Sequence, residues 1–128
     1  MKIKIDTKEK FRVIYVEEQY LSANLSDNLR KLLLNCLNET PPNIVLNLHS
    51  VEQISPEVAE TLQDLQQQFY DKKQSFVICA LQPEVEGQLD AGGTLENLNA
   101  TPTESEAWDI IQMEEIEREL FSDENDFE

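Results

Sequence analysis

The sequence predicts a single α/β domain whose mixed β-sheet has about four or five strands, an N-terminal hairpin and about four α-helices. Three observations support this fold class. Residues 3–16 alternate polar and apolar side chains, which is typical of a half-buried hairpin. Residues 44–48 and 75–81 are nearly continuous apolar runs, typical of strands buried on both faces. Segments with helical apolar spacing separate these runs, and this alternation predicts a mostly parallel sheet joined by right-handed crossovers.

The first 21 residues are expected to form the hairpin. Ile3 and Ile5 alternate with charged residues, and Phe11 and Val13 resume the alternation after a polar turn at 7–10. A period of two places alternate side chains on one face of a strand. We therefore expect antiparallel strands with these apolar residues turned inward.

A helix is predicted over 21–38. Its core-facing residues recur at helical spacing, and they are Leu25, Leu29, Leu32, Leu33, Cys36 and Leu37. Ser22 or Ser26 can cap its start, and Ser22 is favoured because Leu25 already belongs to the apolar stripe. Pro41 and Pro42 are expected to end it, since proline cannot continue a helix.

The best-patterned part of the chain is a buried strand at 43–48, a short polar connection and an amphipathic helix that continues to Tyr70. Ser55-Pro56 is a helix-start signal. A serine oxygen can accept a hydrogen bond from the first turn, and proline at the first helical position has no N–H to leave unpaired. Any binding or regulatory site is expected at this strand-to-helix junction.

The remaining elements are predicted from local signals. Residues 75–81 form a strand, Gln82-Pro83 opens a short helix that Gly92-Gly93 ends, and residues 95–102 hold at most a brief strand. Residues 103–106, Thr-Glu-Ser-Glu, match a capping box and start a last helix expected to reach Phe121. The acidic residues 122–128 are expected to be disordered.

Charge and composition restrict the classes of partner. The net charge of −16 disfavours nucleic acid and anionic lipid as partners, because both carry the same sign. No apolar run has signal-peptide form or approaches the roughly 20 residues of a membrane helix, so a cytoplasmic protein without direct membrane insertion is expected. Cys36 and Cys79 lie in apolar patterns and are expected to be reduced core thiols.

No pattern in the sequence indicates catalysis, a cofactor or a metal. A nucleophile elbow, a phosphate-binding glycine loop, a dinucleotide fingerprint and zinc-ligand spacing are all missing. His49 is the only histidine and is expected to be structural or loop-facing, without a Ser, Cys or carboxylate constellation around it. The glutamates at 114–119 do not have the ligand spacing of a calcium loop. A non-enzymatic protein is therefore expected, and an enzyme using Glu57 and His49 is kept as an alternative.

The order of elements resembles the STAS domain, the fold of bacterial anti-sigma factor antagonists. Tyr20-Leu-Ser-Ala23 stands where that family commonly has a Gly-x-Leu-Asp-Ala phrase. Asn43-Ile-Val-Leu-Asn-Leu-His-Ser-Val51 is similar to its hydrophobic strand followed by Asp-Leu-Ser-x-Val. Ala80-Leu-Gln-Pro83 is similar to its last central strand and third helix. The resemblance implies a STAS-like domain over 1–112, followed over 113–128 by an acidic helical extension and tail.

The resemblance also implies where a phosphorylation switch would lie. Family switches carry Asp, then one or two Ser or Thr residues, then Gly where the second helix begins, and here those positions hold Ser55, Pro56, Glu57 and Val58. Glu57 replaces the usual phosphoacceptor. Ser55 is either a plain helix cap, which we favour, or a displaced phosphoacceptor. Glu57 either complements the helix dipole, which we favour, or imitates a phosphorylated residue permanently.

These observations predict a non-catalytic regulatory module that binds a protein partner through residues 51–58 and is not switched by ordinary phosphorylation. By resemblance, the partner would be an anti-sigma factor of the histidine-kinase-like ATPase type. A second hypothesis is a soluble accessory subunit of a membrane lipid or anion transport assembly. A further possibility is that apolar residues within the acidic C-terminal segment, among them Ile116 and Leu120, dock on a basic groove.

Overall fold

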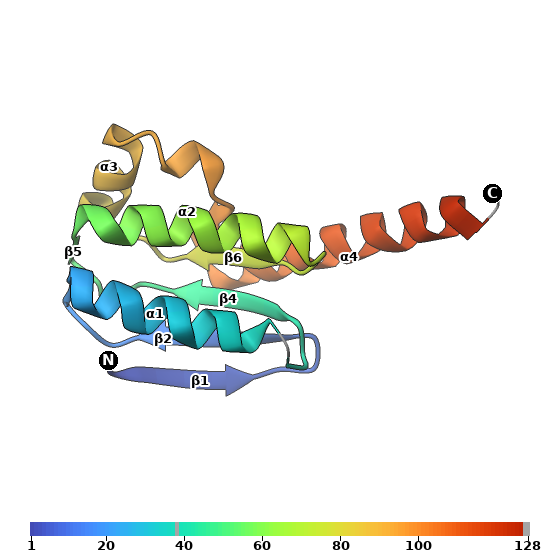
Figure 1. The fold of residues 1–128 in the computed structure, drawn as a ribbon, viewed down its shortest axis with the longest axis horizontal. Helices are drawn as coiled ribbons and strands as arrows, with labels where there is room; N and C mark the ends of the chain where they lie inside the picture. The colour runs from blue at the N-terminus through green and yellow to red at the C-terminus, as the bar shows by residue number, and fades with distance from the viewer. Residues whose placement is uncertain (38, 127–128) are drawn as a thin grey trace.

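A computed structural model describes residues 1–37 and 39–126, with side chains described as far as residue 120. The elements are β1 (Ile3–Thr7), β2 (Phe11–Val16), β3 (Tyr20–Leu21), α1 (Ala23–Cys36), β4 (Asn43–Asn47), β5 (Gln53–Ile54), α2 (Pro56–Asp71), β6 (Phe76–Cys79), α3 (Pro83–Ala91), the 3-10 helix η1 (Leu95–Asn97), β7 (Ala100–Thr101) and α4 (Glu104–Asp126). This arrangement confirms the α/β class, the N-terminal hairpin and the helices that the sequence predicts (Figure 1).

The main sheet has five strands in the order β1-β2-β4-β6-β7. β1 and β2 pair antiparallel, with Ile3 opposite Val16, and every other neighbouring pair is parallel. β1 is an edge strand, and the side chain of Ile5 is 45% exposed instead of turned inward as predicted. The prediction failed there because the period of two does not say whether a helix covers the edge.

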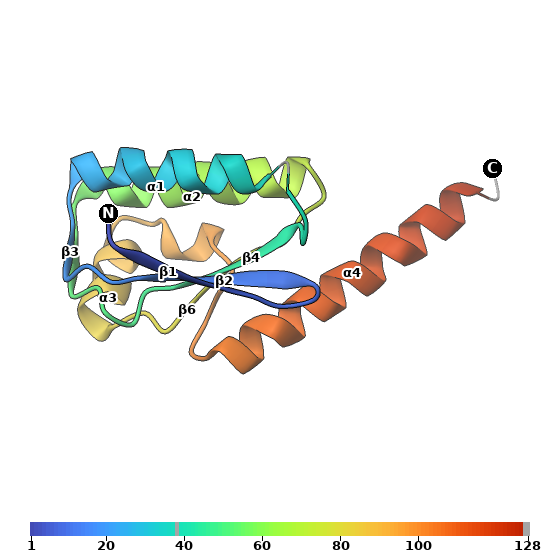
Figure 2. The ribbon, with the colours of Figure 1, turned by 90° about the horizontal axis from the view of Figure 1, so that it is seen from below.

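Helices cover both faces of the sheet, which explains the apolar run in β4. Ile44 and Leu46 belong to the core beneath α1 and α2, whereas Val45 belongs to a second cluster with Ala107 and Ile111 of α4. In Figure 2, α1 and α2 lie on one side of the strands and α4 lies on the other. Cys36 and Cys79 are both free and belong to these two separate clusters, as expected for core thiols.

A second, two-stranded sheet was not predicted. β3 and β5 pair in parallel, with Tyr20 opposite Gln53 and Leu21 opposite Ile54. Each strand has two residues, so neither produces a detectable periodicity. This small sheet lies where the chain enters α1 and α2, and it therefore fixes the strand-to-helix junction.

The predicted helix starts are largely confirmed. The Ser22 hydroxyl accepts a hydrogen bond from the Leu25 N–H at 3.3 Å, so Ser22 caps α1 and Ser26 does not. Thr103 accepts from the Glu106 N–H at 3.2 Å at the start of α4.

The end of α4 differs from the prediction. The helix continues through Asp126, beyond Phe121, because the acidic residues of its second half do not break helical geometry. The part of the disordered-tail prediction that covers 127–128 lies outside the described residues. None of the helices described is both long enough and apolar enough to span a bilayer.

Candidate functional site

The predicted site lies where β5 leads into α2. Ser55 and Val58 are buried, with 6% and 0% of their surface exposed, whereas Pro56 and Glu57 are exposed. Of the predicted site residues, only Pro56 and Glu57 therefore present surface to a partner. Glu57 stands in the first turn of α2, where a negative charge is favourable to the helix dipole.

The side chains of Gln88 in α3 and of Gln82, the residue before α3, hold this connection in place. The Gln88 amide oxygen accepts from the Ile54 N–H at 3.1 Å, and its amide nitrogen donates to the Ile54 carbonyl at 3.3 Å. Gln82 donates to the His49 carbonyl at 2.7 Å. These side chains bind backbone groups that a further strand could have paired, so on this side the connection is held by side chains instead of sheet pairing. The sequence carried no signal for these contacts, since each glutamine is a single polar residue in or next to a short helix.

β3 completes the other side of the junction. The Ser55 N–H donates to the Leu21 carbonyl at 2.9 Å, and the Glu52 N–H donates to the Gln19 carbonyl at 2.7 Å. This pairing places Tyr20, which is 51% exposed, opposite Gln53 on the same edge. Tyrosines are enriched at protein interfaces, so Tyr20 is a candidate contact residue that the sequence alone did not indicate.

The start of α2 is also bound to α1. The Ser26 hydroxyl lies 2.6 Å from the hydroxyl of Thr61 and donates to the Glu57 carbonyl at 3.3 Å. Arg30 of α1 forms an ion pair with Asp64 of α2. The backbone of Glu57 is therefore anchored while its side chain remains exposed.

Ser55 occupies the cap position of α2, but its side chain does not cap the helix. Its backbone is extended and Pro56 follows it, as predicted, and its carbonyl accepts from the Val58 N–H at 3.0 Å. Among the described residues, the Ser55 hydroxyl has no hydrogen-bond partner although it is buried. The predicted serine capping bond is thus absent, and the enclosed hydroxyl is not directly accessible to a kinase in this conformation.

His49 lies exposed on the connection after β4, as predicted, but it is also part of a hydrogen-bonded chain that the sequence did not indicate. The Asn47 amide oxygen accepts from the His49 backbone N–H at 2.9 Å and lies 2.9 Å from Nδ1 of the same ring. Nε2 lies 3.2 Å from the Ser50 hydroxyl. Because the Asn47 oxygen is only an acceptor, we assign the proton to Nδ1, which leaves Nε2 to accept from Ser50.

The chain extends to α4 and β2. Asn47 donates to a Glu104 carboxylate oxygen at 2.9 Å, and a hydrogen bond to the same carboxylate, with a smaller contribution from burial, raises the pKa of Tyr15 to about 12. Within the described part of the chain, neither ring nitrogen of His49 hydrogen-bonds to Glu57, so the alternative catalytic pair is not assembled. The network links strand ends to α4 and gives no support to that alternative.

An open cavity of about 750 Å³ lies beside this network. Its lining carries both signs of charge, and consists of Lys2, Lys4, Tyr15, Glu17, Glu18, Gln19, His49, Ser50 and Glu52. Over residues 1–37 and 39–120, no three His, Cys, Asp or Glu side chains are placed to bind a metal ion. The cavity borders the junction through Gln19 and Glu52, and therefore adds polar surface to the same end of the molecule.

Comparisons with known proteins place this geometry in a family. The profile of the STAS domain matches residues 2–107. No curated protein sequence matches the chain at a significant level. The fold is similar to that of a solved anti-sigma-factor antagonist (STAS) domain protein from Planctomyces limnophilus, with a TM-score of 0.74, 18% identity, and coverage of 86% of this chain and 97% of that one.

Two further solved structures share the fold. SpoIIAA, described as a Bacillus cell fate determinant in its phosphorylated form, aligns with a TM-score of 0.63 and 12% identity, over 86% of this chain and 99% of that one. The murine solute carrier 26 family member A9 anion transporter aligns with a TM-score of 0.70 and 11% identity, over 84% of this chain and only 18% of the transporter. With most of its length matched by the family profile and with the strand order described above, the chain belongs to the STAS domain family.

Proposed function

We propose that this STAS domain is a non-catalytic regulatory module that binds a protein partner through β5 and the first turn of α2. By similarity to anti-sigma factor antagonists, the partner is an anti-sigma factor of the kinase-like ATPase type, and the site of action is the cytoplasm. The observation that carries the proposal is the exposed Glu57 carboxylate on a backbone held from three sides.

The fixed backbone supports binding without rearrangement. Gln88, β3 and α1 each hold a different part of the junction, so little conformational entropy remains to be lost when a partner binds. Tyr20 and Pro56 supply exposed apolar surface, and Glu52 and Glu57 supply negative charge beside it. A partner surface with an apolar centre and basic rim fits this composition.

Glu57 supports a module without an on–off phosphorylation switch at this position. A carboxylate has no hydroxyl to accept a phosphoryl group, and its charge does not depend on a kinase or phosphatase. In this proposal the domain binds in one permanent state, and regulation comes from its amount or from the partner.

Affinity purification from a native extract tests the proposal. The wild-type chain is expected to retain a switch-type ATPase or a sigma-regulating protein, and Glu57→Lys is expected to lose it because the charge at the contact is reversed. Asp71→Lys makes the same charge change at the other end of α2 and should retain the partner. Equal retention by all three proteins would overturn the docking site.

Phosphoryl transfer tests the second half of the proposal. Incubation of the purified partner with labelled nucleoside triphosphate should leave the wild-type chain unlabelled. Glu57→Ser restores a hydroxyl at an exposed position and should become labelled if the partner is a kinase-like ATPase. Labelling of the wild-type chain would contradict a permanently fixed state, and loss of that labelling in Ser55→Ala would identify Ser55 as the acceptor.

A transport subunit is the alternative function, favoured by the shared fold with a segment of an anion transporter. It predicts that the chain is recovered in a membrane fraction as part of a complex that detergent dissociates. Recovery with membranes, together with enrichment of a transport protein in the affinity experiment, would favour this alternative over an anti-sigma partner.

A further inference from the structure

Helix α4 carries an exposed apolar strip, which we define as Met113, Ile116 and Leu120. Their side chains are 60%, 57% and 59% exposed. Their spacing places them on one face of a helix, one turn after another. The other large apolar side chains exposed in the described part, Ile5, Tyr20 and Tyr70, lie on three different elements, so the strip is the one place where such side chains are aligned.

The opposite face of α4 is already bound to the domain. Ala107 and Ile111 are buried against the sheet, and Asn43 and Asn99 donate to Glu115 and Glu114 at 3.1 and 3.3 Å. A rotation that turned the strip inward would break these contacts. The strip is therefore a second face, left without a partner inside the described molecule.

The helix extends beyond the part of the chain that the family shares. The STAS domain match ends at residue 107, whereas α4 continues to Asp126. Figures 1 and 2 show α4 leaving the body at the end remote from β5 and the start of α2. The strip is thus separate from the docking site of the proposed function, and the two are tested independently.

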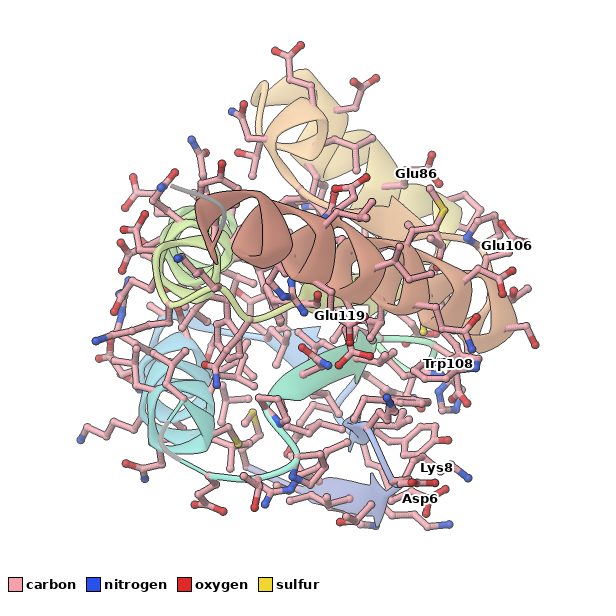
Figure 3. All side chains as sticks on the ribbon, turned by 90° about the vertical axis from the view of Figure 1, so that its right-hand side faces the viewer. Asp6, Lys8, Glu86, Glu106, Trp108 and Glu119 are labelled. Atoms are coloured by element: carbon pink, nitrogen blue, oxygen red, sulfur yellow. The ribbon has the colours of Figure 1, made fainter. Side chains whose placement is uncertain are left out.

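The charges beside the strip specify the chemistry of what can cover it. Asp109, Glu117 and Glu119 are exposed on the same helix, and Figure 3 shows Glu119 where α4 points toward the viewer. The single basic residue after Gln74 is Arg118, and it is turned toward the body, where it donates to Ser75 at 3.2 Å. The rim of the strip is therefore negative, and none of the salt bridges among the described residues involves these three carboxylates.

We propose that the strip binds an amphipathic helix of a partner protein, one whose apolar stripe is flanked by lysine or arginine. Apolar residues at this spacing are those that a helix uses to pack against another helix, and a basic rim would face the glutamates. A second copy of this chain fits poorly, since its own strip carries the same acidic rim and each chain has a net charge of −16. An anionic membrane surface is disfavoured for the same reason.

The test uses the full chain and a fluorescently labelled synthetic helix of leucine and lysine with one apolar face, followed by fluorescence anisotropy. Because a highly acidic chain attracts any basic peptide, the decisive comparison is between variants. Ile116→Gln is expected to weaken binding about tenfold, since it removes a buried aliphatic side chain from the interface. Ile5→Gln, the same change on β1, is expected to leave the affinity unchanged.

A charge-matched pair completes the experiment. Glu117→Gln with Glu119→Gln should weaken binding, whereas Glu84→Gln with Glu86→Gln on α3 changes the net charge equally and should have a much smaller effect. Ile116→Ala, which keeps helix propensity, replaces Ile116→Gln if circular dichroism shows that the latter loses helix. The proposal would be overturned if the wild-type chain, Ile116→Gln and Ile5→Gln bound the peptide with equal affinity. It would also be overturned if sedimentation velocity showed a wild-type dimer that Ile116→Gln converts to a monomer.

Discussion

The hydroxyl oxygens of Ser26 and Thr61 lie 2.6 Å apart in a buried contact between α1 and α2. Only 2% and 3% of these residues is exposed, and the Ser26 hydroxyl also donates to the carbonyl of Glu57. A polar pair at this point joins the two helices directly beneath the candidate site. The position of Glu57 therefore depends on a contact that lies within the helix–helix packing.

Removing one member of this pair should destabilise the domain. Thr61→Val keeps the shape of the side chain but deprives Ser26 of its closest partner, and we expect a loss of about 1–3 kcal/mol in the free energy of unfolding. The double change Ser26→Ala with Thr61→Val should lose less than the sum of the single changes, because no hydroxyl is left unpaired. Urea unfolding measures these free energies, and Gln63→Ala, at an exposed position of α2, is the control. Additive losses in the double variant would contradict the coupling between the two hydroxyls.

Gln88 is expected to control the rigidity of β5. Gln88→Ala removes the partners of both Ile54 backbone groups, so the Ile54 N–H should exchange with deuterium faster than in the wild-type chain. Gln88→Glu keeps an acceptor for that N–H and should exchange at an intermediate rate. Unchanged exchange in Gln88→Ala would show that β3 alone holds the junction.

Ser55 and Ser22 offer a matched comparison of two helix starts. Ser22→Ala removes a capping bond and should lower the free energy of unfolding by about 1 kcal/mol. Ser55→Ala removes a buried hydroxyl without a described partner and should leave stability unchanged or increase it. Thermal or urea unfolding of both variants measures these effects. If Ser55→Ala lowered the free energy of unfolding as much as Ser22→Ala, the Ser55 hydroxyl would be hydrogen-bonded in solution.

Tyr15 should lose its proton at an unusually high pH. Its hydrogen bond to the Glu104 carboxylate, with a smaller effect of burial, raises its pKa from 10.0 to about 12. The difference in ultraviolet phenolate absorbance between the wild-type chain and Tyr15→Phe isolates this residue during a pH titration. Glu104→Gln should move the Tyr15 pKa back toward 10.0 because it removes the negative charge, and an unchanged pKa would contradict this cause.

Ionisation of the Cys79 thiol should lower the free energy of unfolding at alkaline pH. Burial, with a smaller effect of Glu104, raises its pKa from 9.0 to about 12. Above pH 9.0 the unfolded chain releases this proton while the folded chain keeps it, so stability is complete below pH 9.0 and falls as pH rises toward 12. Urea unfolding at about pH 8 and about pH 10.5 should show a smaller decrease in Cys79→Ala than in the wild-type chain.

The parts of the fold that the sequence predicts are those with a repeated physical signal. β4 was predicted from its nearly continuous apolar run. That run reflects the helices on both faces of the sheet, since every position from Asn43 to Asn47 is buried. The starts of α1 and α4 were predicted because Ser22 and Thr103 accept hydrogen bonds within the first turn. The signal for each of these features lies within a few consecutive residues, so the local sequence contains the information.

The strand-to-helix junction was predicted from local signals, but the contacts that hold it were not. Gln88 and Ile54 are far apart in sequence and meet only because α3 folds back onto β5. Tyr20 is exposed because its short strand pairs at the edge of the molecule, which two residues cannot signal. Tertiary contacts between single polar side chains carry no periodicity, and they decided which predicted site residues reach the surface.

Helix α4 is held at its base by the stacking of Trp108 on Phe11, whose ring centroids lie 4.9 Å apart, and Figure 3 shows Trp108 on the side that faces the N-terminal strands. Its 23 residues correspond to a length of about 34 Å. Hydrogen bonds from Asn43 to Glu115 and from Arg118 to Ser75 also hold the helix as far as Arg118, so a length of about 12 Å projects beyond these contacts. A turn of about 10° at Arg118 would move the end of the helix by only about 2 Å, and the direction in which α4 projects is therefore set by the body of the domain.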